Sequence, residues 1–120
     1  LYALHKLRAQ GLRVRVAEAA PEIGGTWYYN RYPGARCDVE SVDYCYSFSE
    51  ELQQEWDWTE KYATQAEILR YLNWVADKLD LRRDIAFNTR VVSAVFDEHE
   101  LIWTITTDTG RPLTARFVVM

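Results

Sequence analysis

A change of hydrophobic period at Gly11 limits the possible folds of this chain more than any other feature. The leucines at positions 1, 4 and 7 share one helical face, and glycine is typical of the position just after a helix C-terminus. The next segment, Leu12 to Glu18 (LRVRVAE), alternates apolar and charged side chains as a strand does. A helix, a tight turn and a strand that ends in an acidic residue predict the second half of a βαβ unit.

The rest of the chain predicts one more helix and a meander. TQAE, Thr64 to Glu67, is a capping-box pattern in which the hydroxyl and the carboxylate each satisfy a free N–H. Apolar residues then recur every three or four positions to about Leu81, so we expect an amphipathic helix that covers a sheet face. From Ala86 the period becomes two, through FNTRVVSAVFDE, LIWTITT and LTARFVVM, with DTGRP as the last turn. The expected fold class is α/β, a partial Rossmann-like domain with an antiparallel three-stranded β-meander.

Composition disfavours several classes of function. The chain has 120 residues, 27% of them charged, and a net charge of -4, which does not suit a polyphosphate backbone, so no nucleic acid is expected. No apolar run has the length of a membrane span and no signal peptide is recognisable, so we expect no membrane and a cytoplasmic location. Cys37 and Cys45 are too few for a disulfide framework or a zinc site, and no metal is expected. The ends fall within a helical and a strand pattern, which indicates a segment of a longer protein.

The stretch from Gly24 to Ser41, GGTWYYNRYPGARCDVES, fits neither a helical nor a strand period. Its paired glycines leave backbone N–H groups open to a pyrophosphate or a ribityl chain, although a plain turn also uses glycines. Trp27, Tyr28 and Tyr29 could wall a flat heteroaromatic ring or belong to an aromatic core. Together with Glu18, whose carboxylate could accept hydrogen bonds from a ribose diol, this stretch favours a cofactor site.

The triplet Arg36-Cys37-Asp38 allows several roles. Arg36 could bind a phosphate or carboxylate in bidentate fashion, and Asp38 could hold another cation, or the two could pair to stabilise the loop. Cys37 lacks a neighbouring histidine to act as base, so a nucleophilic role is disfavoured. Downstream, the alternation of aromatic and small residues from Tyr44 to Phe48 predicts a short extended piece.

These blocks resemble the flavin-dependent Baeyer–Villiger monooxygenases, the phenylacetone and cyclohexanone monooxygenase group. The likeness covers nearly the whole chain and is most specific in GGTWYYNRYPGARCD and SFSEEL…EILRYL. The family has two dinucleotide-binding domains, one for FAD and one for NADPH. The resemblance implies that residues 1–120 are an internal fragment of the FAD-binding domain, lacking the upstream glycine motif and the downstream NADPH domain.

The resemblance also implies roles for individual residues. Glu18 would bind the adenosine ribose of FAD, and Val91 would meet the adenine through its backbone. The pyrophosphate and flavin side would be lined by Gly25, Thr26, Trp27, Tyr28 and Tyr29, and Tyr44 would also contact FAD. The family most often has tryptophan where this chain has Tyr29.

For the reaction itself, the resemblance implies a catalytic role for Asp38 beside the flavin, where it would position a catalytic arginine outside this chain. Arg36, Cys37 and Asp38 would border NADPH. NADPH would reduce FAD, O₂ would add at the flavin C4a, and the peroxyflavin would attack a small-molecule ketone to give an ester or lactone. Two alternatives stay open, an N- or S-oxygenating flavin monooxygenase and a non-catalytic truncated binding module. The particular ketone and the oligomeric state do not follow from the resemblance.

The isolated 120-residue chain is expected to be inactive and to bind FAD weakly or not at all, because the glycine motif and the NADPH domain lie elsewhere. Titration of the purified chain with FAD, followed by flavin fluorescence, measures this. Tight stoichiometric binding would contradict the expectation.

Overall fold

The helix, turn and strand predicted for the start of the chain are present in the computed structural model, which describes residues 1–120. Helix α1 spans Tyr2–Ala9, and Gly11 adopts φ 77, the left-handed conformation that glycine favours. Strand β1 is only Val16–Ala17, shorter than predicted, because its partner β2, Ile85–Ala86, has two residues as well. The pair is parallel, as expected in a βαβ unit.

Helix α4 spans Gln65–Lys78, and its N-cap Thr64 accepts a hydrogen bond from the Glu67 N–H, as the capping box predicts. The second contact predicted for the capping box, from the Glu67 carboxylate back to the helix start, is wrong. The Glu67 carboxylate is buried and accepts instead from the N–H and hydroxyl of Thr59, 2.9 and 3.0 Å away, because the preceding loop folds over the helix start. At 14 residues α4 is the longest helix, and none of the helices has the length and apolar character needed to cross a membrane.

The apolar side of α4 packs mainly on loops rather than on a sheet, which corrects the expectation that it covers a sheet face. Tyr71 and Val75 form a fully buried cluster with Leu52, around which several large rings pack, namely Tyr46, Phe48, Trp56, Trp58 and Trp74. Full burial of such a side chain contributes about 1.5–3 kcal/mol, so these loops depend on the helix. Only the C-terminal half of α4, through Leu72 and Ala76, packs on the cluster that includes Ile85 of β2.

Two short helices escaped the sequence analysis. Helix α2, Thr26–Tyr29, lies within the stretch that fits no period, and four residues are too few to show one. Helix α3 spans Glu50–Gln54, and its N-cap is Ser49, whose hydroxyl accepts a hydrogen bond from the Leu52 N–H. The extended piece predicted for residues 44–48 is wrong, because this segment forms turns and the Tyr46 N–H donates to the buried Tyr71 hydroxyl, 2.7 Å away, instead of to a neighbouring strand.

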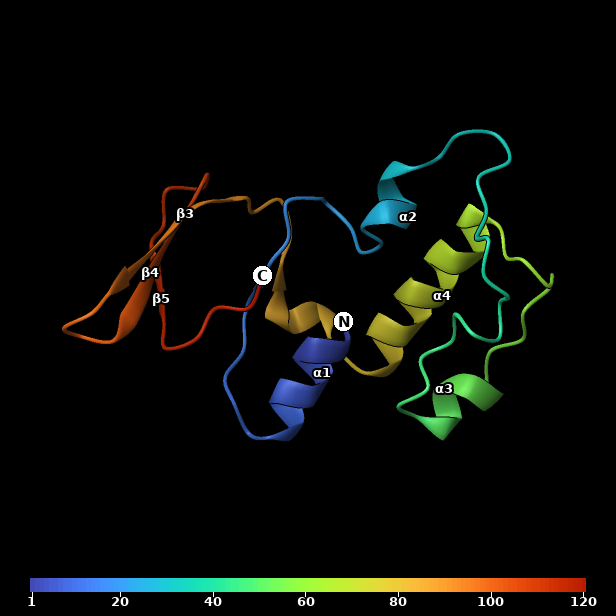
Figure 1. Ribbon diagram of the computed structural model, residues 1–120, viewed down its shortest axis with the longest axis horizontal. Helices are drawn as coiled ribbons and strands as arrows, with labels where there is room; N and C mark the ends of the chain where they lie inside the picture. Colours follow the sequence, from blue (N-terminus) through green and yellow to red (C-terminus); the bar gives the residue numbers. More distant parts are fainter.

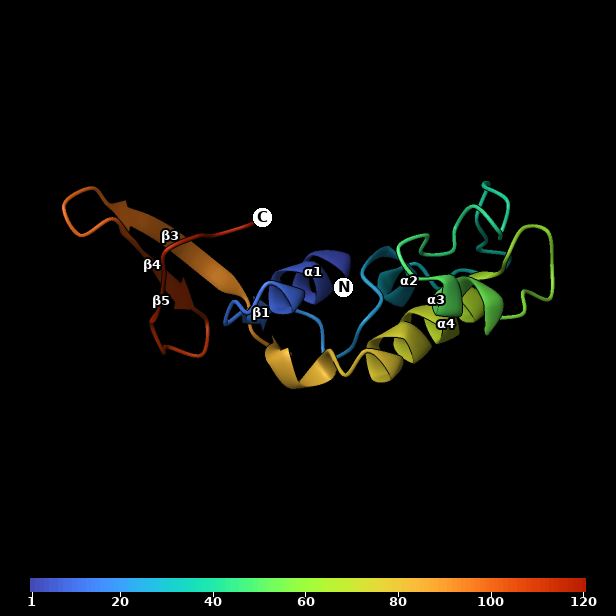
Figure 2. The same ribbon diagram turned by 90° about the horizontal axis from the view of Figure 1, so that it is seen from below.

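The predicted three-stranded antiparallel meander is confirmed in the order β3-β4-β5, with β3 at Val91–Asp97, β4 at Ile102–Thr107 and β5 at Leu113–Ala115. It begins at residue 91 rather than 87 because Asn88 adopts φ 50, which breaks the extended chain after β2. The molecule is elongated, 52 × 33 × 22 Å, with the meander at one end and α2, α3 and α4 at the other (Figure 1; Figure 2).

Gly24 offers a test of the packing between α2 and α4. It has φ 138, and a methyl group there would overlap Leu69 Cδ1 and lie 3.0 Å from Tyr28 Cβ. We expect Gly24→Ala to lower the free energy of unfolding by about 2–3 kcal/mol, measured by urea unfolding.

The matched control is Gly110→Ala, where φ is 76 but nothing lies within 4 Å of the added methyl. Here only backbone strain acts, so the expected loss is about 1 kcal/mol. Equal losses at the two positions would show that the contact with Leu69 does not matter.

Tyr71 makes the stability depend on alkaline pH. Burial, reinforced by the contact with the Cys45 thiol, raises the pKa of the Tyr71 hydroxyl well above its usual value of 10. Above pH 10 the unfolded chain therefore releases a proton that the folded chain keeps, and the free energy of unfolding falls. The test is urea unfolding of the wild type and of Tyr71→Phe between about pH 9 and about pH 11.5. Relative to the variant, the unfolding free energy of the wild type should fall ever more steeply, toward about 1.4 kcal/mol per pH unit. Parallel curves for the two proteins would contradict this assignment.

Candidate functional site

Backbone pairing fixes the Arg36-Cys37-Asp38 triplet. The Gln65 N–H donates to the Ala35 carbonyl at 2.9 Å, and the Cys37 N–H donates to the Ala63 carbonyl at 3.0 Å. Farther along, the Ser41 N–H reaches the carbonyl of Lys61 at 2.8 Å. Side chains alternate along such an extended segment, so Cys37 points into the core while its two neighbours in the triplet point outward.

The outward-facing residues of the triplet differ in their partners. The Arg36 guanidinium donates to the Glu60 carboxylate at 2.9 Å and to the Tyr62 carbonyl at 3.1 Å, so the alternative of an Arg36–Asp38 pair is not realised. Asp38 is exposed and forms no hydrogen bond or ion pair within the chain. Its carboxylate is therefore free to hold a cation or a donor from outside the chain.

Cys37 is placed in the core rather than at a reactive surface. Its side chain is 6% exposed and packs with Ala63 and Ile68. A buried thiol in apolar surroundings is not an activated nucleophile, in line with the sequence prediction. A cofactor beside this residue could meet its backbone but not its sulfur.

Helix α2 presents free backbone donors at its start. Gly25 precedes the helix with φ 51, and nothing lies within 4 Å of the position a Cβ would occupy. The N–H groups of Gly25 and Thr26 donate to no other group of the chain, as expected at a helix N-terminus. An anionic group can therefore approach this backbone without obstruction.

The aromatic residues of α2 divide between core and surface. The Trp27 indole N–H donates to the Tyr44 hydroxyl at 2.5 Å, and the two rings meet edge to face with centroids 5.9 Å apart. Tyr28 meets Tyr29 edge to face at 5.2 Å, and the Arg31 guanidinium lies 4.3 Å above the Tyr28 ring. Tyr29 is 62% exposed, so its ring is available to a partner outside the chain.

Glu18 follows β1 directly, and its backbone is bonded to the segment that leads to Val91. The Glu18 backbone bonds to the Ala86 carbonyl and to the Thr89 N–H, both at 2.9 Å, so the chain leading into β3 passes directly beside it. One carboxylate oxygen of Glu18 accepts from the Ala20 N–H at 2.7 Å, and the other has no partner. Val91 follows two residues after Thr89 and is exposed.

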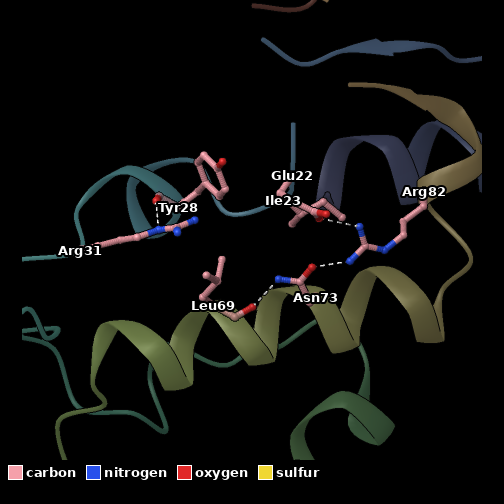
Figure 3. Close-up of a pocket in the computed structure, with 7 residues that line it drawn as sticks. All are labelled: Glu22, Ile23, Tyr28, Arg31, Leu69, Asn73 and Arg82. Atoms are coloured by element: carbon pink, nitrogen blue, oxygen red, sulfur yellow. Dashed lines mark hydrogen bonds and ion pairs between the residues drawn. The ribbon is translucent and has the colours of Figure 1, made fainter. Parts of the chain in front are cut away.

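The predicted residues thus form two groups, one at the end of β1 and one around α2, joined by the segment that connects β1 to α2 (Figure 1). Two features escaped the sequence analysis. One is Gln65, whose side-chain amide donates to the Trp27 carbonyl. The other is an open pocket of about 390 Å³ between α2 and α4 (Figure 3), lined by Glu22, Ile23, Tyr28, Arg31, Leu69, Asn73 and Arg82. Of the predicted residues only Tyr28 lines it, and its polar residues are too scattered in sequence to predict it.

The chain is similar in sequence and in fold to known proteins. The family described as "NAD(P)-binding Rossmann-like domain" matches residues 1–55. An acetone monooxygenase (methyl acetate-forming) from Gordonia sp. (strain TY-5) is 53% identical over 119 residues, which are 99% of this chain and 22% of the relative. The solved structure of an oxidized steroid monooxygenase bound to NADP is 67% identical, with a TM-score of 0.94, over 97% of this chain and 22% of that protein.

By sequence and by fold, the chain is a homologue of the Baeyer–Villiger monooxygenases. It spans about a fifth of the length of these relatives. A phenazine N-monooxygenase from Lysobacter antibioticus is similar too, 52% identical over 120 residues, covering 99% of this chain and 22% of the relative. The segment that these relatives share with the chain therefore includes both groups of predicted site residues.

The Trp27–Tyr44 hydrogen bond can be tested by a double-mutant cycle. Tyr44→Phe leaves the half-buried indole N–H without a partner and should cost about 1–3 kcal/mol of unfolding free energy. In a Trp27→Phe background the same change should cost less, with a coupling energy of about 0.5–2 kcal/mol by urea unfolding. Additive losses would show that the two residues stabilise the fold independently.

Proposed function

We propose that residues 1–120 are an internal part of the FAD-binding domain of a longer FAD- and NADPH-dependent monooxygenase, which inserts one oxygen atom of O₂ into a ketone to give an ester or lactone. The similarity to an acetone monooxygenase and a steroid monooxygenase structure supports the reaction class. The observation that carries the proposal is Asp38, an exposed and unpaired carboxylate on a segment fixed by backbone hydrogen bonds. The glycine motif and the NADPH domain would belong to other parts of that protein.

The free polar groups and the aromatic rings of the two groups of predicted residues fit FAD. The unpartnered carboxylate oxygen of Glu18 suits a ribose diol. Val91, two residues after the Thr89 that bonds to Glu18, would meet the adenine through its backbone. The free N–H groups of Gly25 and Thr26 suit the pyrophosphate. The rings that would wall the flavin are Trp27, Tyr28, Tyr29 and Tyr44.

When bound, FAD supplies the electron transfer and oxygen activation that no side chain provides. The chain's own residues would orient it and keep water away. Because Arg36 is held by Glu60, the Asp38 carboxylate stays free to bind a guanidinium from outside this chain and keep that charge beside the reacting oxygen. Arg36, Asp38 and the backbone of Cys37 would border the nicotinamide cofactor.

A second candidate is oxygenation at nitrogen, favoured by the 52% identity to a phenazine N-monooxygenase. It would use the same FAD residues and differ in the acceptor. In either case we propose a cytoplasmic enzyme that acts on small molecules, independently of nucleic acid and membranes.

The full-length protein tests the proposal directly. It is incubated with FAD, NADPH, O₂ and a panel of cyclic and aryl ketones plus phenazine, and products are identified by mass spectrometry. Esters or lactones formed in step with NADPH oxidation would support ketone oxygenation, and an N-oxide would support the second candidate. Hydrogen peroxide alone would support the flavin site and reject both acceptors, whereas failure to bind FAD would favour a non-catalytic module.

Asp38→Ala should lower the rate of ester formation by about 100-fold, because the guanidinium that Asp38 would hold beside the reacting oxygen is no longer positioned there. The matched control is Asp43→Ala, another exposed aspartate on the same loop, which should retain the wild-type rate. Equal activity of the two variants would remove Asp38 from the proposed site.

A further inference from the structure

The three carbonyls at the start of α2 each accept a hydrogen bond from a side chain. The Thr26 carbonyl also accepts from the Asn30 backbone N–H at 2.9 Å, but a helix of four residues leaves most of its carbonyls without such a partner, so side-chain donors matter. Asn30 donates to the Thr26 carbonyl at 2.9 Å, and Arg31 donates to the Tyr28 carbonyl at 2.6 Å. Both donors lie within four residues of their acceptors, so they shape α2 without fixing its place in the fold.

The carbonyl of Trp27 is different, because its donor is the side-chain amide of Gln65 on another element. This is the one hydrogen bond from elsewhere in the chain to the backbone of α2. Gln65 is half-buried as the first residue of α4, a position with a well-defined backbone. This amide therefore adds a directional contact to the apolar packing between α2 and α4.

The same residue also holds the segment that carries Asp38. The Gln65 backbone N–H donates to the Ala35 carbonyl at 2.9 Å, and its neighbour Thr64 forms a β-bridge with Arg36. One residue thus bonds to both parts of the loop between Gly24 and Ser41, through its side chain on one part and its backbone on the other.

We infer that Gln65 is a positioning residue, which sets the donor-bearing start and the aromatic rings of α2 at a fixed distance from Asp38. This inference rests on the proposed function, because it makes Gln65 act on the flavin through Trp27 without contacting the cofactor. A substitution of the side chain would leave the Ala35 contact intact and release α2 alone.

The test uses the full-length flavoprotein and Gln65→Met, which keeps the length and helix propensity of the side chain but removes the donor. We expect FAD to bind about 10-fold more weakly, since groups that orient a binding residue typically contribute that much. The visible circular dichroism of the bound flavin should change as well, because α2 turns relative to the ring. A loss of packing remote from the site would not alter that spectrum.

Gln53→Met is the matched control, since Gln53 is exposed on α3 and its side chain forms no hydrogen bond. It should match the wild type in FAD affinity and spectrum. Gln65→Asn, which keeps an amide but is too short to reach Trp27, should behave like Gln65→Met and serves where that variant fails to fold. If a Gln65 variant binds FAD with wild-type affinity and spectrum, the inference is wrong while the proposed function stands. A wild-type protein that binds no FAD contradicts both.

Discussion

The backbone pairing between residues 35–41 and residues 61–65 is the interaction on which the rest of the site depends. It turns an irregular loop into a segment with a strand-like alternation, so that Cys37 is buried and Asp38 faces outward. The pairing also brings Arg36 to Glu60, which keeps the guanidinium away from Asp38. Without it, nothing in the chain would hold the unpaired Asp38 carboxylate at a defined place.

Helix α4 explains why that pairing can exist in a chain with so little sheet. Only two residue pairs join β1 and β2, so the sheet cannot anchor the loops. Instead, the aromatic rings of the loops pack against the fully buried Tyr71 and Val75 on one side of α4. The start of the same helix then supplies Thr64 and Gln65 to the loop that carries the site.

Elements with a clear period were predictable, and contacts that depend on tertiary packing were not. The stripe of α4 and the alternation of β3 and β4 follow from side-chain spacing alone. Helix α2 is too short for any period, and Ile85 pairs with Val16 across 69 positions, which local pattern cannot reveal. At the site, the sequence left open whether Asp38 pairs with Arg36, and the partners of Glu67 and Arg36, namely Thr59 and Glu60, lie where a local sequence pattern could not identify them.

A crystal structure of the full-length protein with FAD bound is the most direct test of the account. We predict that a Glu18 carboxylate oxygen contacts the adenosine ribose, that the free N–H groups before Trp27 face the pyrophosphate, and that the Asp38 carboxylate lies on the flavin side. A cofactor bound elsewhere, with Glu18 and Asp38 both in solvent, would contradict the central claim that these two groups of residues hold it.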